Sequence, residues 1–145
     1  MLPVRDNDIG LEVALTTDIY STKTYGMKIE DVPLNQLDIK GYKDDIDAMK
    51  QAIYKILLTE RYKFVIYSWN YGIELQDLYG KPVPYCCVEL ERRTKEALLQ
   101  DTRIKDVYNF DFDTSIVEQI YIKFTAKTIF GEIDIEHEVS LTNVQ

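Results

Sequence analysis

Acidic side chains are the most numerous groups of this 145-residue chain that could do chemistry, but no motif selects a pair of them. The chain has 25 Asp and Glu against 17 Lys and Arg, a formal charge of −8. A glycosidase needs two carboxyl groups about 5 to 9.5 Å apart in a cleft, one of them with a raised pKa. The sequence has no phosphate loop, no Gly-x-Ser-x-Gly and no His-Glu-x-x-His. We therefore expect no catalytic residue, no metal and no cofactor.

The densest acidic row lies near the carboxyl terminus. Glu132, Asp134, Glu136 and Glu138 alternate with apolar residues, so a strand would place all four on one face. Such a row could hold a cation, but we favour a solvated face that discourages uncontrolled edge pairing. The only histidine, His137, falls on the opposite, apolar face, and we interpret it as a partly buried structural residue.

Two adjacent cysteines, Cys86 and Cys87, lie on a predicted helix, where their side chains diverge and cannot easily bond to each other. We expect both to be reduced. We interpret Cys87 as a small core residue and Cys86 as a bystander, because metal or redox chemistry would need further ligands.

Charge and hydropathy argue against two classes of partner. The Lys and Arg residues are dispersed, whereas binding to nucleic acid needs a concentrated basic surface. No apolar run approaches the roughly 18 residues that span a bilayer, and residues 1–10 do not resemble a signal peptide. We expect neither nucleic acid nor a membrane as a partner, and a location in the cytoplasm that made the protein.

The middle of the chain predicts two amphipathic helices. Asp44 or Asp45 would cap the first one. Its inner face would comprise Ile46, Met49, Ile53, Ile56 and Leu57, and its outer face Asp47, Lys50, Gln51 and Lys55. The second would run from about Pro84 to Gln100. Its inner stripe would comprise Cys87, Leu90, Thr94, Ala97 and Leu98, with Glu89, Arg92, Arg93, Lys95 and Glu96 facing water or a partner.

Between these helices, the short apolar run from Phe64 to Tyr67 predicts a buried strand at the middle of the core. Four residues with a structural role, Trp69, Asn70, Tyr71 and Gly72, would follow it, with Gly72 supplying a positive φ in the turn. The segment from Glu74 to Tyr79 allows a short helix before Gly80, Lys81 and Pro82 stop it.

The last third of the chain predicts strands and a long C-terminal hairpin. Whether the loop is Phe130-Gly131 alone or the four residues 129–132, the pattern sets Lys127 against Asp134 and Lys123 against Glu138. The apolar face would comprise Ile120, Ile122, Phe124 and Ala126 with Leu141, Val139, His137 and Ile135. The fold class is therefore α+β, a single domain with a mostly antiparallel sheet of about four to six strands and two main helices on one side. Residues 1–24 would be an extended arm, and residues 25–145 the core domain.

The wording and order of several motifs resemble one family. TERYKFVIYSWNYGIEL, followed by a Gly-Lys-Pro turn and a helix ending in ALLQDTRI, is similar to the sheath-initiator (baseplate wedge) family of contractile phage tails and phage-tail-like bacteriocins, most closely the branch of Gram-positive bacteria and their prophages. The resemblance covers roughly residues 25–141. The family's Glu-Pro-Arg signature reads Asp101-Thr102-Arg103 here, and its Gly-Glu-Arg segment is missing, since residues 63–65 read Lys-Phe-Val.

This resemblance implies a structural baseplate protein and its partners. Sheath initiators ring the base of the tail tube in about six copies, and arms of the first sheath subunits complete a sheet with them. The implied sheath-binding edge comprises Glu132, Ile133, Asp134, Ile135, Glu136, His137, Glu138 and Val139. Asp101 and Arg103 would bind the baseplate wedge, close to the hub proteins and the tail tube. The protein would assemble in the host bacterial cytoplasm and then remain in the virion or bacteriocin particle.

Two other functions stay open from the sequence. A cell-wall hydrolase of the tail is one, because members of this family have carried a lysozyme-like label. The other is a tail-completion or connector protein, which is also structural but acts at the far end of the particle.

Overall fold

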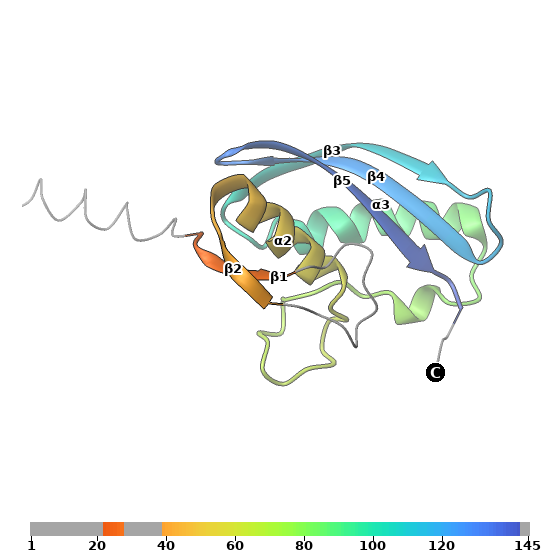
Figure 1. Cartoon of the computed structure of the whole chain (residues 1–145). Helices are drawn as coiled ribbons and strands as arrows, with labels where there is room; N and C mark the ends of the chain where they lie inside the picture. Colours follow the sequence, from red (N-terminus) through yellow and green to blue (C-terminus); the bar gives the residue numbers. More distant parts are fainter. Residues whose placement is uncertain (1–21, 28–38, 143–145) are drawn as a thin grey trace, which may run out of the picture.

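The computed structural model describes residues 22–27 and 39–142, and most of the predicted arm lies outside this part. The elements in order are β1 (Thr24–Met27), β2 (Ile39–Lys43), α2 (Asp45–Leu57), the 3-10 helix η2 (Gln76–Leu78), α3 (Val83–Leu98), β3 (Ile104–Asp113), β4 (Gln119–Thr128) and β5 (Gly131–Ser140). β1 and β2 form one antiparallel sheet, and the other has the order β3-β4-β5. Figure 1 shows α2 and α3 on the same side of the three-stranded sheet. The predicted α+β class is confirmed.

Helix α2 begins where the sequence predicts and is fastened to β1. Asp44 is its N-cap, and the amide of Asp45 donates to Asp44 Oδ1 at 2.9 Å. The Thr22 hydroxyl also donates to Asp44, and this bond holds the pKa of that carboxyl below its usual range. Gln51 is buried rather than outward-facing, because its amide group pairs with β1: Nε2 donates to Tyr25 O and Oε1 accepts from Met27 N. The Gln51 side chain thereby forms hydrogen bonds with backbone groups of β1, as a neighbouring strand would.

Helix α3 buries Leu90, Thr94, Ala97 and Leu98 as predicted, but its buried face also includes Cys86 and Arg93. Cys86, predicted to be a bystander, is completely buried, whereas Cys87 is partly buried and packs against the core. Arg93, predicted to face outward, is buried because it clamps η2 to the helix. Its guanidinium donates to the Asp77 carboxylate, to Glu74 O at 2.9 Å and to Glu89 Oε2 at 3.0 Å. A buried arginine with these partners is tolerated since each charge is paired.

The predicted central strand from Phe64 to Tyr67 is wrong. These residues form an exposed loop below α2 (Figure 1), and the chain is held at the loop's base by a parallel bridge between Glu60 and Ile73. Ile73 lies in the core in place of the predicted run. Gly72 does have the predicted positive φ, at 95°, and a Cβ there would lie 2.5 Å from Thr59 O.

The hairpin faces are as predicted, but its register is not. The loop is Ile129-Phe130, so Lys127 opposes Glu132 and Lys123 opposes Glu136, two residues away from the predicted partners. A shift by two residues keeps every side chain on its face. The inner face therefore still joins Ile120, Ile122, Phe124 and Ala126 to Ile133, Ile135, His137 and Val139.

Substitution of two glycines with positive φ, Gly72 and Gly80, tests how tightly the chain is packed at the base of the loop that contains Phe64 to Tyr67. Gly80, at φ 75°, has open space where a Cβ would lie, whereas Gly72 does not. Gly80→Ala should destabilise the protein by about 1 to 2 kcal/mol through backbone strain. Gly72→Ala should lose at least about 1 kcal/mol more through overlap with Thr59. Urea unfolding of both variants measures this difference, and equal losses would contradict the packing described.

Candidate interaction sites

The outer edge of β5 is the longest regular backbone edge of the sheet. In the described ranges, β5 pairs with β4 and no strand lies on its other side. The β4–β5 register runs through ten consecutive pairs without a bulge. Figure 1 shows the second half of β5 continuing beyond α2.

The direction of the β5 amides follows from this register. Opposed residues in an antiparallel pair alternate between those that exchange main-chain hydrogen bonds and those that do not. A two-residue loop closes on a hydrogen-bonded pair, here Thr128 and Gly131, and at the far end Leu141 N donates to Glu118 O at 2.7 Å. The odd-numbered residues of β5 therefore face β4. Glu132, Asp134, Glu136, Glu138 and Ser140 direct their main-chain groups outward.

The opposite edge, β3, is much less regular. Its pairing with β4 is interrupted between Ile104 and Asp106 and again between Tyr108 and Asp111. Asn109, inside the second interruption, has a φ of 57°. Bulges of this kind bend a strand and spoil it as a template for a further strand. Of the two sheet edges, β5 is therefore the one suited to strand addition.

Part of the β5 edge is already in contact with α2. The Tyr54 hydroxyl donates to Glu136 O at 3.1 Å, which agrees with an outward carbonyl at that residue. Near the start of the strand, Ile46 Cδ1 lies 3.7 Å from the position a Cβ would take at Gly131. An incoming strand would displace Tyr54 from Glu136 or pair with the stretch that follows it.

Three residues of the acidic row on the outer face of the sheet each bind a different neighbouring side chain. Lys123 Nζ lies 2.8 Å from Glu136 Oε1, and the Thr125 hydroxyl donates to Asp134 at 2.8 Å. Tyr108 donates to Glu132 at 2.6 Å, and this bond raises the pKa of Tyr108 to about 12. Among the residues that the structure describes, no group of three or more His, Cys, Asp or Glu could hold a metal ion.

The second predicted site, Asp101 and Arg103, forms an ion pair within the chain. Arg103 donates to Asp101 through Nε at 2.9 Å, Nη2 at 2.7 Å and its backbone amide at 3.0 Å. Burial raises the pKa of the Asp101 carboxyl, but the bonds from Arg103 outweigh it and leave this pKa below its usual range. The fork therefore fixes the turn after α3 without the proline of the family signature.

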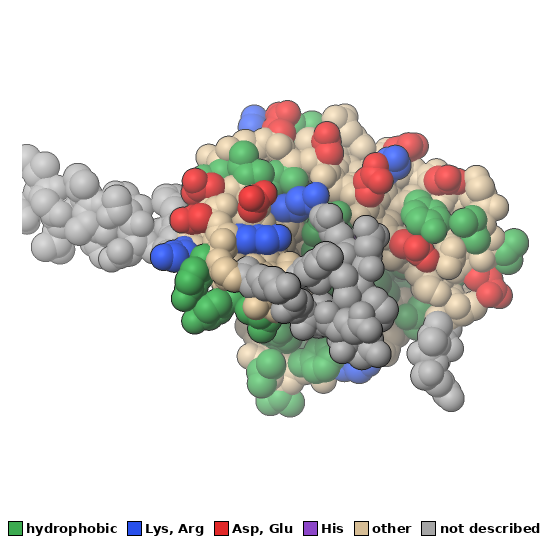
Figure 2. Space-filling model, viewed as in Figure 1, with side chains coloured by type: hydrophobic (Ala, Val, Ile, Leu, Met, Phe, Trp, Pro, Cys, Tyr) green, Lys and Arg blue, Asp and Glu red, His purple; other side chains and the backbone are tan. Residues whose placement is uncertain are grey.

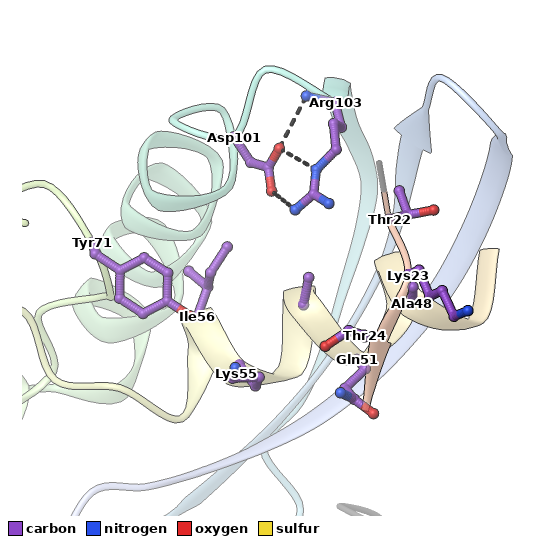
Figure 3. Close-up of a pocket in the computed structure, with 11 residues that line it drawn as sticks. Thr22, Lys23, Thr24, Ala48, Gln51, Lys55, Ile56, Tyr71, Asp101 and Arg103 are labelled. Atoms are coloured by element: carbon purple, nitrogen blue, oxygen red, sulfur yellow. Dashed lines mark hydrogen bonds and ion pairs between the residues drawn. The ribbon is translucent and has the colours of Figure 1, made fainter. Parts of the chain in front are cut away.

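This pair lies at one end of a pocket of about 260 Å³. Figure 3 shows the pocket between α2, the start of β1 and the Asp101–Arg103 turn, with the two charged groups facing each other. A neighbouring pocket of about 210 Å³ shares Ile56, Tyr71 and Asp101 with it. The structure thus brings Tyr71 beside Asp101, a proximity that no pattern in the sequence indicates.

The four residues predicted to have a structural role lie in different surroundings. Trp69 is exposed, Asn70 donates to Gln100 Oε1 at 3.2 Å, and Tyr71 stacks on Tyr67 with ring centroids 4.6 Å apart. Gly72 closes the base of the loop. None of the helices in the described part of the chain is long and apolar enough to cross a membrane.

Comparison with known proteins gives one family match and one curated relative. The model of the family described as contractile injection system sheath initiator matches residues 23–131. Phage-like element PBSX protein XkdS of Bacillus subtilis strain 168 is 32% identical over 124 residues, which cover 83% of this chain and 84% of that protein.

Among solved structures, the fold is similar to that of a Geobacter sulfurreducens protein provisionally described as a tail lysozyme. The TM-score is 0.56 at 16% identity, and the match covers 67% of this chain and 91% of the other. Likeness at this level of identity shows a shared fold and carries no activity with it.

Burial of His137 makes the stability of the fold depend on pH. Burial on the inner face lowers its pKa from 6.5 to about 4. Because the unfolded chain binds this proton more readily, stability should be full above pH 6.5 and fall as the pH drops from 6.5 towards 4, by at most about 3 kcal/mol.

Urea unfolding at pH 7.5 and pH 5 measures this loss, because carboxyl groups titrate mostly below that window. His137→Leu should remove most of the difference between the two pH values. An unchanged difference in the variant would show that His137 is not its source.

Proposed function

Because the chain belongs to the contractile injection system sheath initiator family, we propose that it starts sheath assembly by offering the outer edge of β5 to an extended segment of a sheath subunit. The family is a structural one of contractile tails, and the expected likeness to a Gram-positive prophage protein is confirmed. The observation that carries the proposal is the unbroken ladder of ten β4–β5 pairs, which ends at a strand with outward amides.

The chemistry of the incoming strand follows from the side chains beside it. On the outer face, Asp134 opposes Thr125 and Glu138 opposes Tyr121, so neither acid has a cation across the β4–β5 pair. Lys or Arg at the facing positions of a new strand would supply those charges. On the inner face the neighbours are His137 and Val139, which favour apolar side chains. An alternating basic and apolar segment fits this edge best.

Attachment to the baseplate wedge uses a different part of the surface in this proposal. Asp101 and Arg103 line the pocket of about 260 Å³ beside α2, and they lie at the end of α3, whose outer face is charged. The pair is already formed, so the site is preorganised for a side chain of a wedge or hub protein. Residues 1–24 would act as an arm on the core domain of residues 25–145, with about six copies around the tail tube.

A cell-wall hydrolase is the alternative that the Geobacter neighbour suggests. A glycosidase acid needs a raised pKa. In the described part of the chain, the pKa shifts found for carboxyl groups are all downward: those of Asp44, Asp77, Glu89, Glu96, Asp101 and Asp113. This electrostatic pattern favours the structural role.

Proline at an outward amide tests strand addition directly. Glu138→Pro removes one outward N–H and leaves the bonds to β4, so the domain should still fold. We expect it to reduce sheath polymerisation from purified subunits at least about tenfold, measured by sedimentation and electron microscopy.

Glu138→Ala is the matched control, because it loses the same side chain but keeps the amide. It should start sheath assembly far better than the proline variant. If a folded Glu138→Pro protein started assembly as efficiently as the control, the β5 edge would not be the binding edge.

The wedge contact is tested by Arg103→Lys, which keeps the charge but loses the planar fork. We expect weaker retention of the variant on purified baseplate wedges and unchanged binding to sheath subunits. Equal retention of both proteins on the wedges would exclude the Asp101–Arg103 turn as the wedge contact.

A further inference from the structure

The loop between α2 and η2 presents apolar side chains to solvent. Tyr62, Phe64, Val65, Ile66, Tyr67 and Trp69 are all exposed, with Val65 at 101%, Ile66 at 86% and Trp69 at 76%. Figure 2 shows hydrophobic side chains gathered along the lower edge of the molecule, over the loop that Figure 1 draws below α2. We name residues 62–69 the apolar loop. Contiguous exposure of this kind marks interaction surfaces.

The base of the apolar loop is held in one shape. Arg61 Nε donates to Gly72 O at 3.1 Å, and Arg61 Nη1 lies 2.9 Å from Glu96 Oε1 on α3. The backbone of Arg61 donates to Ile73 O at 3.1 Å, and that of Ile73 to Thr59 O at 3.0 Å. These bonds close the loop and tie it to the helix behind it.

Contacts between aromatic rings also fix the conformation of the loop itself. The Phe64 and Tyr67 rings meet edge to face with centroids 6.3 Å apart, and Tyr67 stacks on Tyr71. Ser68 donates to Asn70 Oδ1 at 2.8 Å. A partner would meet a surface whose conformation is already set, so little ordering entropy opposes binding.

The charge around the apolar loop indicates what kind of partner it fits. Residues 62–69 contain Lys63 and no acid, although the whole chain has a formal charge of −8. The acids beside the loop are already bound: Glu60 accepts from the amides of Leu75 and Gln76, and Glu96 pairs with Arg61. The apolar loop therefore carries a single positive charge, that of Lys63, on an acidic protein.

From these observations we infer that the apolar loop docks into an apolar cleft, rimmed by Asp or Glu, on another tail protein distinct from the sheath subunit. A second copy of the chain would bring its own loop with the same charge. An anionic membrane would attract Lys63 but repel the rest of the molecule. This inference rests on the chain being part of a tail particle, but not on strand addition at β5.

A photo-crosslinking residue at Val65, in the full chain assembled into particles, tests the partner. We expect a crosslink to a tail protein other than sheath, at a peptide that mass spectrometry shows to carry acids beside apolar residues. Lys63→Glu should lower the yield at least about fivefold. A crosslink to sheath, to a second copy or to lipid, or no crosslink, would overturn the inference. A second crosslinker at Glu138 reports sheath binding separately, so failure of one surface is distinguishable from failure of the other.

Substitution at the loop tip provides a second test with a matched control. Ile66 and Val117 are both 86% exposed, and Val117 lies in the turn between β3 and β4. Ile66→Asp and Val117→Asp should keep the melting temperature of the parent protein. Only Ile66→Asp should lose incorporation into particles, by at least about tenfold. Equal incorporation of the two variants would contradict a docking role for the loop.

Discussion

The main constraint on this fold is that the backbone N–H and C=O groups of its three-stranded sheet need hydrogen-bond partners, at the sheet edges as well as between the strands. In the described part of the chain, helices cover only one face of this sheet (Figure 1). The β4–β5 hairpin meets this constraint along its inside, with ten regular pairs whose apolar side chains form the core together with α2 and α3. Its outer edge has no such solution within the described residues beyond the bond from Tyr54 to Glu136. Backbone amides at an edge otherwise rely on water or on another chain. In the proposed role in sheath assembly, an incoming strand would form hydrogen bonds with these outward backbone groups of β5.

Helix α3 sets the position of the other surfaces. Arg93 binds η2 from its inner side, and Glu96 holds Arg61 at one flank of the apolar loop. Gln100, just after the end of the helix, holds Asn70 at the other flank. The Asp101–Arg103 turn follows directly at its end. The wedge contact and the loop contact that we propose would therefore be mechanically joined through one helix, while the β5 edge lies across the sheet from it. Such an arrangement suits a protein that links several neighbours.

Sequence patterns predicted those features that depend on periodicity alone. Alternation identified both faces of the hairpin, and helical spacing identified Met49, Ile53, Ile56 and Leu57. Register was missed because a shift of two residues leaves each face unchanged. Gln51 and Arg93 were placed on the wrong side because their partners, Tyr25 in β1 and Asp77 in η2, come from other parts of the chain. Asp101 and Arg103 were recognised from the family signature, but their pocket beside Tyr71 exists only in three dimensions. The apolar run from Phe64 to Tyr67 predicted a core strand because composition cannot distinguish burial within a chain from an exposed surface such as the one proposed to bind a partner.

An image of the assembled baseplate at a resolution that separates strands would test the central claim most directly. The proposed function predicts an extended sheath segment about 4.8 Å from β5, hydrogen-bonded to the outward groups of its second half. Sheath density at another surface, with the outer edge of β5 left open to solvent, would contradict it.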